Sequence, residues 1–288
     1  MTLALTLLAL CAFAANSLLC RLALGAGHID PASFTTLRIL SGAVVLAPLA
    51  LLRSAGASSF HGGPGGLRTG RPGGSWPAAI ALALYAVPFS FAYMSLTAGT
   101  GALLLFGAVQ GAMLAAGLLA GERPGAIAWT GFAVAVAGLL VLVSPGVTAP
   151  APAGAVMMVV AGIAWGIYSL LGRGAVDPVA ATAGNFLRAA PAALLVTLLA
   201  RADAHADRRG VMLAIASGVF TSGIGYVLWY AALPRIGAMR AAIAQLAVPA
   251  MAALGGVIVL GETMTARLGA AAVLILGGIA LALKDRSS

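Results

Sequence analysis

Uninterrupted apolar runs recur along almost the whole chain, and they constrain its fold more than any other feature. Each run has about 20 residues, enough for a helix to cross a hydrocarbon core about 30 Å thick. The runs are continuously apolar instead of alternating, which favours helices over the strands of a barrel. Only 8% of the residues are charged, against roughly 25% in soluble domains. The chain is therefore predicted to be an all-α integral membrane protein.

Ten membrane-spanning helices are predicted. Short connections that contain Pro31, Pro124, Pro145 or Pro178 separate several of them, since proline opens or ends helices. The longer connection at residues 53–75 has the glycine content of a phosphate loop but no Gly-Lys-Ser/Thr ending, so it is predicted to be a flexible cytoplasmic linker. The predicted helices cover residues 2–21, 32–52, 76–96, 99–120, 125–143, 153–172, 179–200, 210–232, 236–259 and 266–284.

The net charge of +9 is better explained by the orientation of the chain in the membrane than by a nucleic-acid partner. Most arginines lie between the predicted spans, where they set topology and meet anionic lipid, so no nucleic-acid partner is predicted. Placing the N-terminus in the cytoplasm puts more arginine and lysine on the inner face. Both termini are therefore predicted to be cytoplasmic, in a bacterial inner membrane. Cys11 and Cys20 lie about 180° apart around one helix, so neither a disulfide nor a metal site is expected.

The two halves of the chain share an ordered set of short motifs. SLLCR at 17–21 recurs as SLLGR at 169–173, and further pairs follow in the same order. Each half has five predicted spans, and because five is odd the second half begins on the opposite face. Residues 1–145 and 150–288 are therefore predicted to be two inverted five-helix repeats around a central cavity. The further pairs are Asp30-Pro31 with Asp177-Pro178, Arg38 with Arg188, and Gly121-Glu122 with Gly261-Glu262.

This arrangement resembles the drug/metabolite transporter superfamily, and more narrowly its EamA-type exporters. The most specific part of the resemblance runs from Tyr230 to Glu262, YAALPRIGAMRAAIAQLAVPAMAALGGVIVLGE, and residues 93–122 match more loosely. Within that group the chain is similar to the YddG-type aromatic amino acid exporters. The resemblance implies a cavity lined by spans 1, 3, 4, 6, 8 and 9. The long linker after the second span departs from the family pattern.

Aromatic residues at helical spacing form the first part of a candidate binding site. Such a stripe is commonly core or lipid-facing, but tyrosine is the repeated residue, and a buried hydroxyl needs a partner inside the protein. An apolar cavity lined with rings suits a flat aromatic or a cationic substrate. The predicted ring residues are Tyr85, Phe89 and Tyr93 in the third span, Trp165 and Tyr168 in the sixth, and Tyr226 and Tyr230 in the eighth.

Amides in the middle of spans form the second part. Asn16, Gln110 and Gln245 are predicted to hold the ammonium and carboxylate of an amino acid, although amides in membranes also bond between helices. Arg38 and Arg188 lie within spans; each is a possible carboxylate ligand, with snorkelling for Arg38 or packing against helix-end carbonyls as the alternative.

Proline, glutamate and glycine residues suggest mechanical roles. Pro88 and Pro249 are predicted to interrupt cavity-lining spans and to act in gating, because they free carbonyls and permit bends. Glu122 and Glu262 are predicted to stabilise the helix that follows each of them. Two further patterns, Gly107-xxx-Gly111 and Gly162-xxx-Gly166, permit close helix contact.

The predicted function is export of aromatic amino acids and related small metabolites by alternating access. All acidic residues and histidines fall at or beyond span ends, which favours facilitated diffusion or exchange over proton coupling and argues against an enzyme. No catalytic residue and no cofactor is predicted, and a monomer suffices. Two alternatives stay open: a proton-driven exporter of cationic drugs or other amino acids, and a membrane scaffold or sensor without flux.

Overall fold

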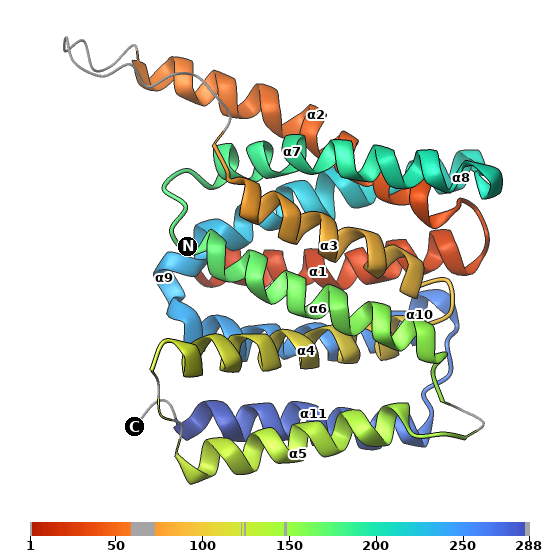
Figure 1. The fold of residues 1–288 in the computed structure, drawn as a ribbon, viewed down its shortest axis with the longest axis vertical. Helices are drawn as coiled ribbons and strands as arrows, with labels where there is room; N and C mark the ends of the chain where they lie inside the picture. Colours follow the sequence, from red (N-terminus) through yellow and green to blue (C-terminus); the bar gives the residue numbers. More distant parts are fainter. Residues whose placement is uncertain (1, 59–72, 122, 124, 147–148, 286–288) are drawn as a thin grey trace.

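Long apolar helices account for nearly all of the chain that the structure describes (Figure 1). The structure, a computed structural model, describes residues 2–58, 73–121, 123, 125–146 and 149–285. Glu122, Pro124 and most of the predicted linker lie outside the described residues. The helices are α1 (Thr2–Gly25), α2 (Pro31–Ser58), α3 (Trp76–Ala92), α4 (Ala98–Leu119), α5 (Ala126–Val143), α6 (Pro152–Gly172), α7 (Pro178–Leu199), the 3₁₀ turn η1 (Arg201–Asp203), α8 (Arg208–Ala216), the π-helix η2 (Ser217–Ile224), α9 (Gly225–Gln245), α10 (Ala247–Leu260) and α11 (Ala266–Asp285).

The lengths and composition of these helices make the chain a multi-pass membrane protein. Among the described residues, seven helices are long and apolar enough to cross a membrane. Three shorter apolar helices, at Trp76–Ala92, Ala247–Leu260 and Ala266–Ala282, accompany them. Large apolar side chains such as Leu119 and Ile258 are 90% and 79% exposed on the outside of the bundle, as a lipid-facing surface requires.

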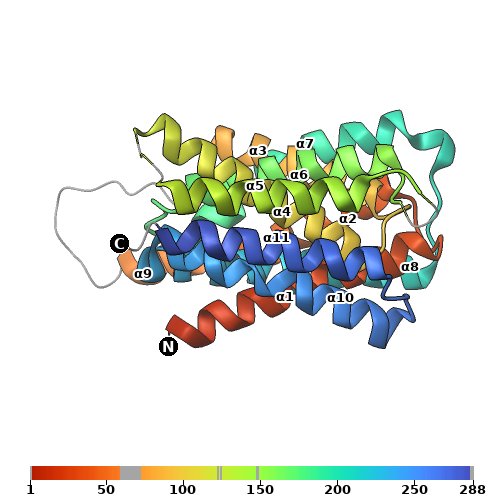
Figure 2. The same ribbon diagram turned by 90° about the horizontal axis from the view of Figure 1, so that it is seen from below.

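Small residues let neighbouring helices approach closely. A Cβ atom added to Gly131 of α5 would lie 2.4 Å from the carbonyl oxygen of Gly278 of α11, and these two helices lie side by side at one edge of the bundle (Figures 1 and 2). Gly162 of α6 lies equally close to α4, since its added Cβ would be 2.3 Å from the Leu105 carbonyl oxygen, while the Cβ of Gly166 would lie 3.0 Å from the Ala112 side chain. The Gly107-xxx-Gly111 pattern behaves differently, because nothing lies within 4 Å of a Cβ added to Gly111.

The helix assignment has no break at residues 232–236, the predicted boundary between the eighth and ninth spans, although the candidate membrane span that begins at Arg208 ends at Ile236. The helix continues through Pro234 to Gln245 and breaks at Leu246. Proline lacks an amide donor, but a bent membrane helix can contain it when neighbouring elements satisfy the backbone groups that it leaves free. Gln245 is therefore the last residue of α9, directly before this break.

A π-helix lies between α8 and α9. Residues Ser217–Ile224, with the sequence SGVFTSGI, form η2 between α8 and α9. A π-helix has hydrogen bonds between residues five apart, one more than in an α-helix, and is frequent at functional sites. Here the serine and threonine residues of η2 face α1 and α2, because Ser217, Thr221 and Ser222 are all buried and bonded to those helices.

A small polar joint ties the two halves together at the end of the bundle where α1 meets α2. Ile29 and Ala206 form an isolated antiparallel bridge, and the His28 Nδ1 lies 2.7 Å from the Asp207 carboxylate. Asp30 accepts hydrogen bonds from the backbone of Ser33 and His205. Burial acts to raise the pKa of Asp30, but these hydrogen bonds outweigh it and leave the pKa below its ordinary value.

The lowered pKa of Asp30 predicts acid lability of this joint. The unfolded-state pKa is about 3.9, so the stabilisation is present above that pH and is lost as the pH falls through the lower folded-state pKa. We expect the melting temperature of the wild type in detergent to fall as the pH is lowered from about 5 to 3. Asp30→Asn should have a lower melting temperature at neutral pH and a smaller decrease over this pH range. Asp203→Asn is the control, since Asp203 is exposed. Equal acid profiles for all three proteins would contradict the assignment.

Candidate functional site

A continuous row of aromatic rings crosses the interior of the bundle. Successive centroids lie 4.8 Å apart from Tyr93 to Phe89, 5.1 Å from Phe89 to Tyr85, 5.0 Å from Tyr85 to Trp165, 5.5 Å from Trp165 to Tyr168, and 5.2 Å from Tyr168 to Tyr230. We call these six residues the aromatic row. Every member is at most 4% exposed. The predicted stripes on α3, α6 and α9 therefore meet inside the protein and do not face lipid.

Further rings surround the middle of the aromatic row. Tyr226 of α9 lies 4.7 Å from Trp165, and Phe13 of α1 lies 5.2 Å from Trp165 and 5.5 Å from Trp229. Offset and edge contacts of this kind are favourable by about 0.5–1.5 kcal/mol each beyond the area they bury. The rings come from helices far apart in the sequence, so an aromatic environment forms only when both halves are in place.

Asn16 joins α1 to the aromatic row and to the π-helix. Its Nδ2 donates to the Tyr85 hydroxyl at 3.2 Å, while its Oδ1 accepts from the hydroxyls of Ser217 at 2.7 Å and Thr221 at 3.0 Å. The residue is only 2% exposed. The three bonds use most of the hydrogen-bonding capacity of the amide, so its position is well defined.

Gln245 contacts a ring of the aromatic row. The Trp165 Nε1 donates to the Gln245 Oε1 at 3.2 Å, and the Gln245 Nε2 is buried without a hydrogen-bond partner. Gln110 is 8% exposed on α4, next to Val109, whose backbone lies against Gly166 of α6.

Arg38 of α2 lies against the middle of the aromatic row and is completely buried. Its Nε donates to the Ser222 hydroxyl at 2.7 Å, and its Nη2 donates to the hydroxyls of Tyr85 at 2.9 Å and Tyr226 at 2.6 Å. The guanidinium carbon lies 5.1 Å from the ring centroids of both Tyr85 and Phe89. Snorkelling of Arg38 is therefore wrong: the cation points into the protein, because four partners from α3, η2 and α9 hold it there.

Arg188 and Asn185 of α7 have structural contacts at the start of α3. The Arg188 Nη1 donates to the carbonyl oxygens of Gly73 and Gly184, at 2.8 and 2.9 Å. The Asn185 Oδ1 accepts from the backbone amide of Ser75 at 3.0 Å. Of the two arginines predicted inside spans, only Arg38 reaches the aromatic row.

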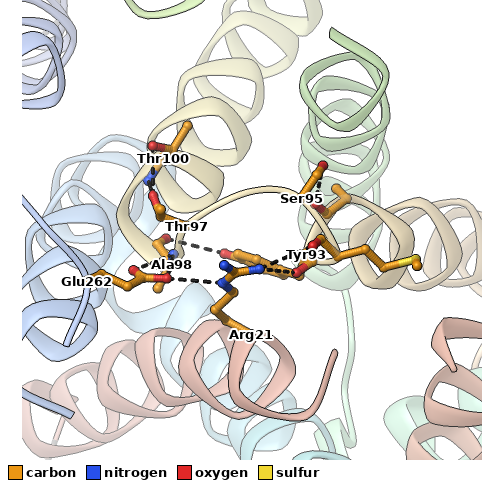
Figure 3. Close-up of polar contacts among 9 residues, drawn as sticks. Arg21, Tyr93, Ser95, Thr97, Ala98, Thr100 and Glu262 are labelled. Carbon is orange, nitrogen blue, oxygen red and sulfur yellow. Dashed lines mark hydrogen bonds and ion pairs between the residues drawn. The ribbon is translucent and has the colours of Figure 1, made fainter. Parts of the chain in front are cut away.

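Glu262 does not stabilise the helix that follows it, contrary to the prediction. Gly261 adopts a left-handed conformation with φ of 67° and turns the chain back, so that the Glu262 carboxylate accepts from the Ala98 amide at the first turn of α4, at 2.9 Å (Figure 3). The same carboxylate pairs with the Arg21 Nε at 3.1 Å, and the Arg21 Nη1 donates to the Tyr93 carbonyl. This cluster joins α1, α3, α4 and α10 beyond one end of the aromatic row.

The two predicted gating prolines occupy different positions. Pro88 lies inside α3, one residue before Phe89, and removes the amide that would bond to the carbonyl of Leu84. Pro249 is the third residue of α10, where no preceding carbonyl requires its amide. The helix break at Leu246 lies three residues before Pro249, as expected for a proline that offers no amide to the Gln245 carbonyl. The gating role of both prolines stays a prediction.

Sequence reasoning missed several residues of the site. The sequence did not predict a place in the site for Phe13, Ser217, Thr221 or Ser222. It also did not predict that Arg38 lies at the centre of the site. The serine and threonine residues of SGVFTSGIGY were a usable signal, because hydroxyls in an apolar span require partners. The π-helix that aims them has no comparable signature.

The chain resembles known proteins in a family match, in overall sequence and in fold. Residues 152–284 match the EamA-like transporter family. The uncharacterized protein PA1977 of Pseudomonas aeruginosa is 50% identical over 285 residues, which cover 99% of this chain and 95% of that protein. A solved protein crystal structure aligns with a TM-score of 0.67 over 97% of this chain and 98% of that one, and at 23% identity this likeness concerns the fold alone.

Proposed function

Because residues 152–284 match the EamA-like transporter family, we propose that the chain exports aromatic amino acids and related small metabolites across the bacterial inner membrane by alternating access. Members of this family are membrane transporters of small molecules and not enzymes. The substrate class and the mechanism are the parts proposed here. No cofactor enters the proposal, and one chain suffices for the pathway.

The aromatic row is the observation that supports an aromatic substrate. Its rings come from α3, α6 and α9, with Phe13 from α1 beside them. Asn16 and Gln245 contact the same rings through Tyr85 and Trp165, which places amide groups beside apolar surface. Small-molecule sites commonly combine such apolar walls with a few polar groups. We propose that the ring of the substrate replaces ring-to-ring contacts of the row and that the amides hold its polar end. Beyond Asn16 and Gln245, the proposed binding residues are Tyr85, Phe89, Tyr93, Gln110, Trp165, Tyr168, Tyr226 and Tyr230.

The pairing of helices supports two inverted repeats, at residues 1–145 and 150–288. Contacts of α3 with α6 are mirrored by contacts of α1 with α9, and contacts of α4 with α6 by contacts of α1 with α10. The exchange of the two halves maps each remaining pair onto itself: α2 with α7, α4 with α10, and α5 with α11. In inverted repeats, alternating access arises when one half rocks against the other around a central site. The ten proposed binding residues are each at most 8% exposed, which corresponds to the closed stage of such a cycle. Bending of α3 at Pro88 would open one side.

We propose facilitated diffusion or exchange as the driving mode, with ten spans and both termini in the cytoplasm. The carboxylates that the structure describes, such as Asp30 and Glu262, bond at the ends of the bundle and not within the aromatic row. The first residue of α1 and the last residue of α11 lie at the same end of the bundle (Figure 1), as an even number of spans requires.

Counterflow into proteoliposomes tests this function. Purified protein is reconstituted with unlabelled phenylalanine inside, and uptake of labelled phenylalanine, tryptophan and lysine is followed with and without a pH gradient. Saturable uptake of phenylalanine and tryptophan, with lysine excluded and no response to the gradient, is the expected result. Uptake of lysine or of organic cations that follows the gradient would favour the proton-driven drug exporter. Absence of any flux would leave the scaffold or sensor as the better reading.

A further inference from the structure

We propose that Arg38 binds the carboxylate of the transported molecule, so that the site selects carboxylates and rejects cations. The inference rests on the proposed function for the identity of the pathway, but it concerns a charge that the aromatic row by itself does not explain. Its first support is the position of Arg38. The guanidinium is completely buried and contacts Tyr85, the same residue that Asn16 and Trp165 contact.

The guanidinium has no carboxylate partner among the side chains that the structure describes. The ion pairs there are Arg21 with Glu262, and His28 with Asp207, both at the ends of helices. Arginine stays protonated in proteins, and a buried charge without a countercharge is unfavourable, especially inside a membrane. Three hydroxyls and two rings lower this cost through neutral hydrogen bonds and cation–π contacts. An anionic ligand is the partner that would neutralise the charge.

The free donor of Arg38 supports a carboxylate in particular. Its Nη1 is buried and has no hydrogen-bond partner, whereas Nε and Nη2 are occupied by hydroxyls. A carboxylate takes two parallel N–H donors of one guanidinium, a geometry that lysine does not reproduce. Each hydroxyl that a carboxylate displaces can turn and donate to it, because hydroxyls are both donors and acceptors. Among the residues that the structure describes, no other buried polar group combines a full charge with an open donor.

The surroundings of Arg38 link anion binding to the second half of the chain. A Cβ atom added to Gly218 of the π-helix would lie 2.2 Å from the Arg38 carbonyl oxygen, so the two backbones touch. Ser222 and Tyr226 hold the guanidinium from the same segment. A carboxylate bound to Arg38 would therefore change the contacts between α2 and the η2–α9 segment. Alternating access requires such a change, because the two halves must move against each other.

The test compares three ligands in wild type and in two Arg38 variants. Phenylalanine, phenylacetate and phenethylamine share a ring and differ in charge, and counterflow is measured for wild type, Arg38→Lys and Arg38→Gln. We expect wild type to carry the two carboxylates and not the amine. In Arg38→Gln we expect at least a hundredfold loss in kcat/KM for the carboxylates, and in Arg38→Lys an intermediate loss that is mostly a raised KM. Arg188→Gln is the matched control, because Arg188 also lies within a helix but bonds to Gly73 and Gly184.

Binding is measured separately, so that failure of the transport proposal can be recognised. The melting temperature of detergent-purified protein is recorded with phenylacetate, benzoate, lactate, inorganic phosphate or phenethylamine. A rise with carboxylates in wild type and Arg188→Gln, absent in folded Arg38→Gln, supports the anion site even if no aromatic amino acid is transported. A rise with phosphate but not with carboxylates overturns the carboxylate assignment. Unchanged carboxylate binding in folded Arg38→Gln or Arg38→Lys, or no rise with any anion, overturns the proposal.

Discussion

Replacing Gly162 by leucine is expected to prevent α6 from packing on α4 and to abolish folding of most of the protein. A Cβ atom at this position would lie 2.3 Å from the Leu105 carbonyl oxygen and 2.7 Å from the Ala108 side chain. The nearest atom belongs to the backbone of α4, so the two helices would have to separate. Overpacking costs about 1–3 kcal/mol at ordinary sites and more where backbone is in the way. Trp165 and Tyr168 on the same helix would leave the aromatic row with it.

The control for Gly162→Leu is Gly111→Leu on the neighbouring helix. No atom lies within 4 Å of a Cβ added to Gly111, so the larger side chain meets open space. Both variants are expressed and followed by fluorescence-detected size-exclusion chromatography with a thermal ramp. We expect aggregation or a strongly lowered melting temperature for Gly162→Leu and a profile close to wild type for Gly111→Leu. Equal behaviour of the two variants would contradict the close contact of α4 with α6.

Replacing Asn16 by alanine is expected to reduce transport by at least tenfold without preventing folding. The substitution removes three hydrogen bonds and leaves the hydroxyls of Tyr85, Ser217 and Thr221 without this partner. Bonds between helices in membranes contribute about 0.6–2 kcal/mol each, and 1.4 kcal/mol corresponds to a factor of ten. Because Tyr85 also contacts Arg38 and Trp165, its displacement disturbs both the charged and the aromatic part of the proposed site.

Asn185→Ala provides the comparison for Asn16→Ala. Asn185 is equally buried, at 1% exposure, but its amide oxygen accepts from Ser75 at the start of α3. Asn185 also lies beside the Tyr168 side chain, so we expect this variant to melt at a lower temperature and to change the KM less than Asn16→Ala does. The measurement is counterflow of phenylalanine, normalised to the amount of folded protein in the vesicles. A wild-type rate and KM in Asn16→Ala would show that the amide has no part in transport.

The helical bundle and most of its members could be predicted from the sequence because membrane spans are determined locally. A run of apolar residues such as 2–21 must satisfy its own backbone hydrogen bonds in lipid, whatever its neighbours are. The same reasoning placed a helix break at residues 232–236, whereas helical backbone continues through Pro234 to Gln245. Helical spacing also predicted that Tyr85, Phe89 and Tyr93 share a face, because that spacing is a property of one helix.

The sequence by itself therefore determined the all-helical membrane class, the apolar spans and the residues with polar or aromatic side chains inside them. Only the tertiary structure decided which of these residues meet. Arg38 turned inward because α3 and the η2–α9 segment present hydroxyls and rings to it, and Glu262 reached Ala98 because Gly261 reverses the chain. The physical reason is the range of the interactions: backbone satisfaction in lipid acts within one helix, whereas the partner of a buried polar group lies on another helix, more than a hundred residues away in the case of Arg38 and Ser222.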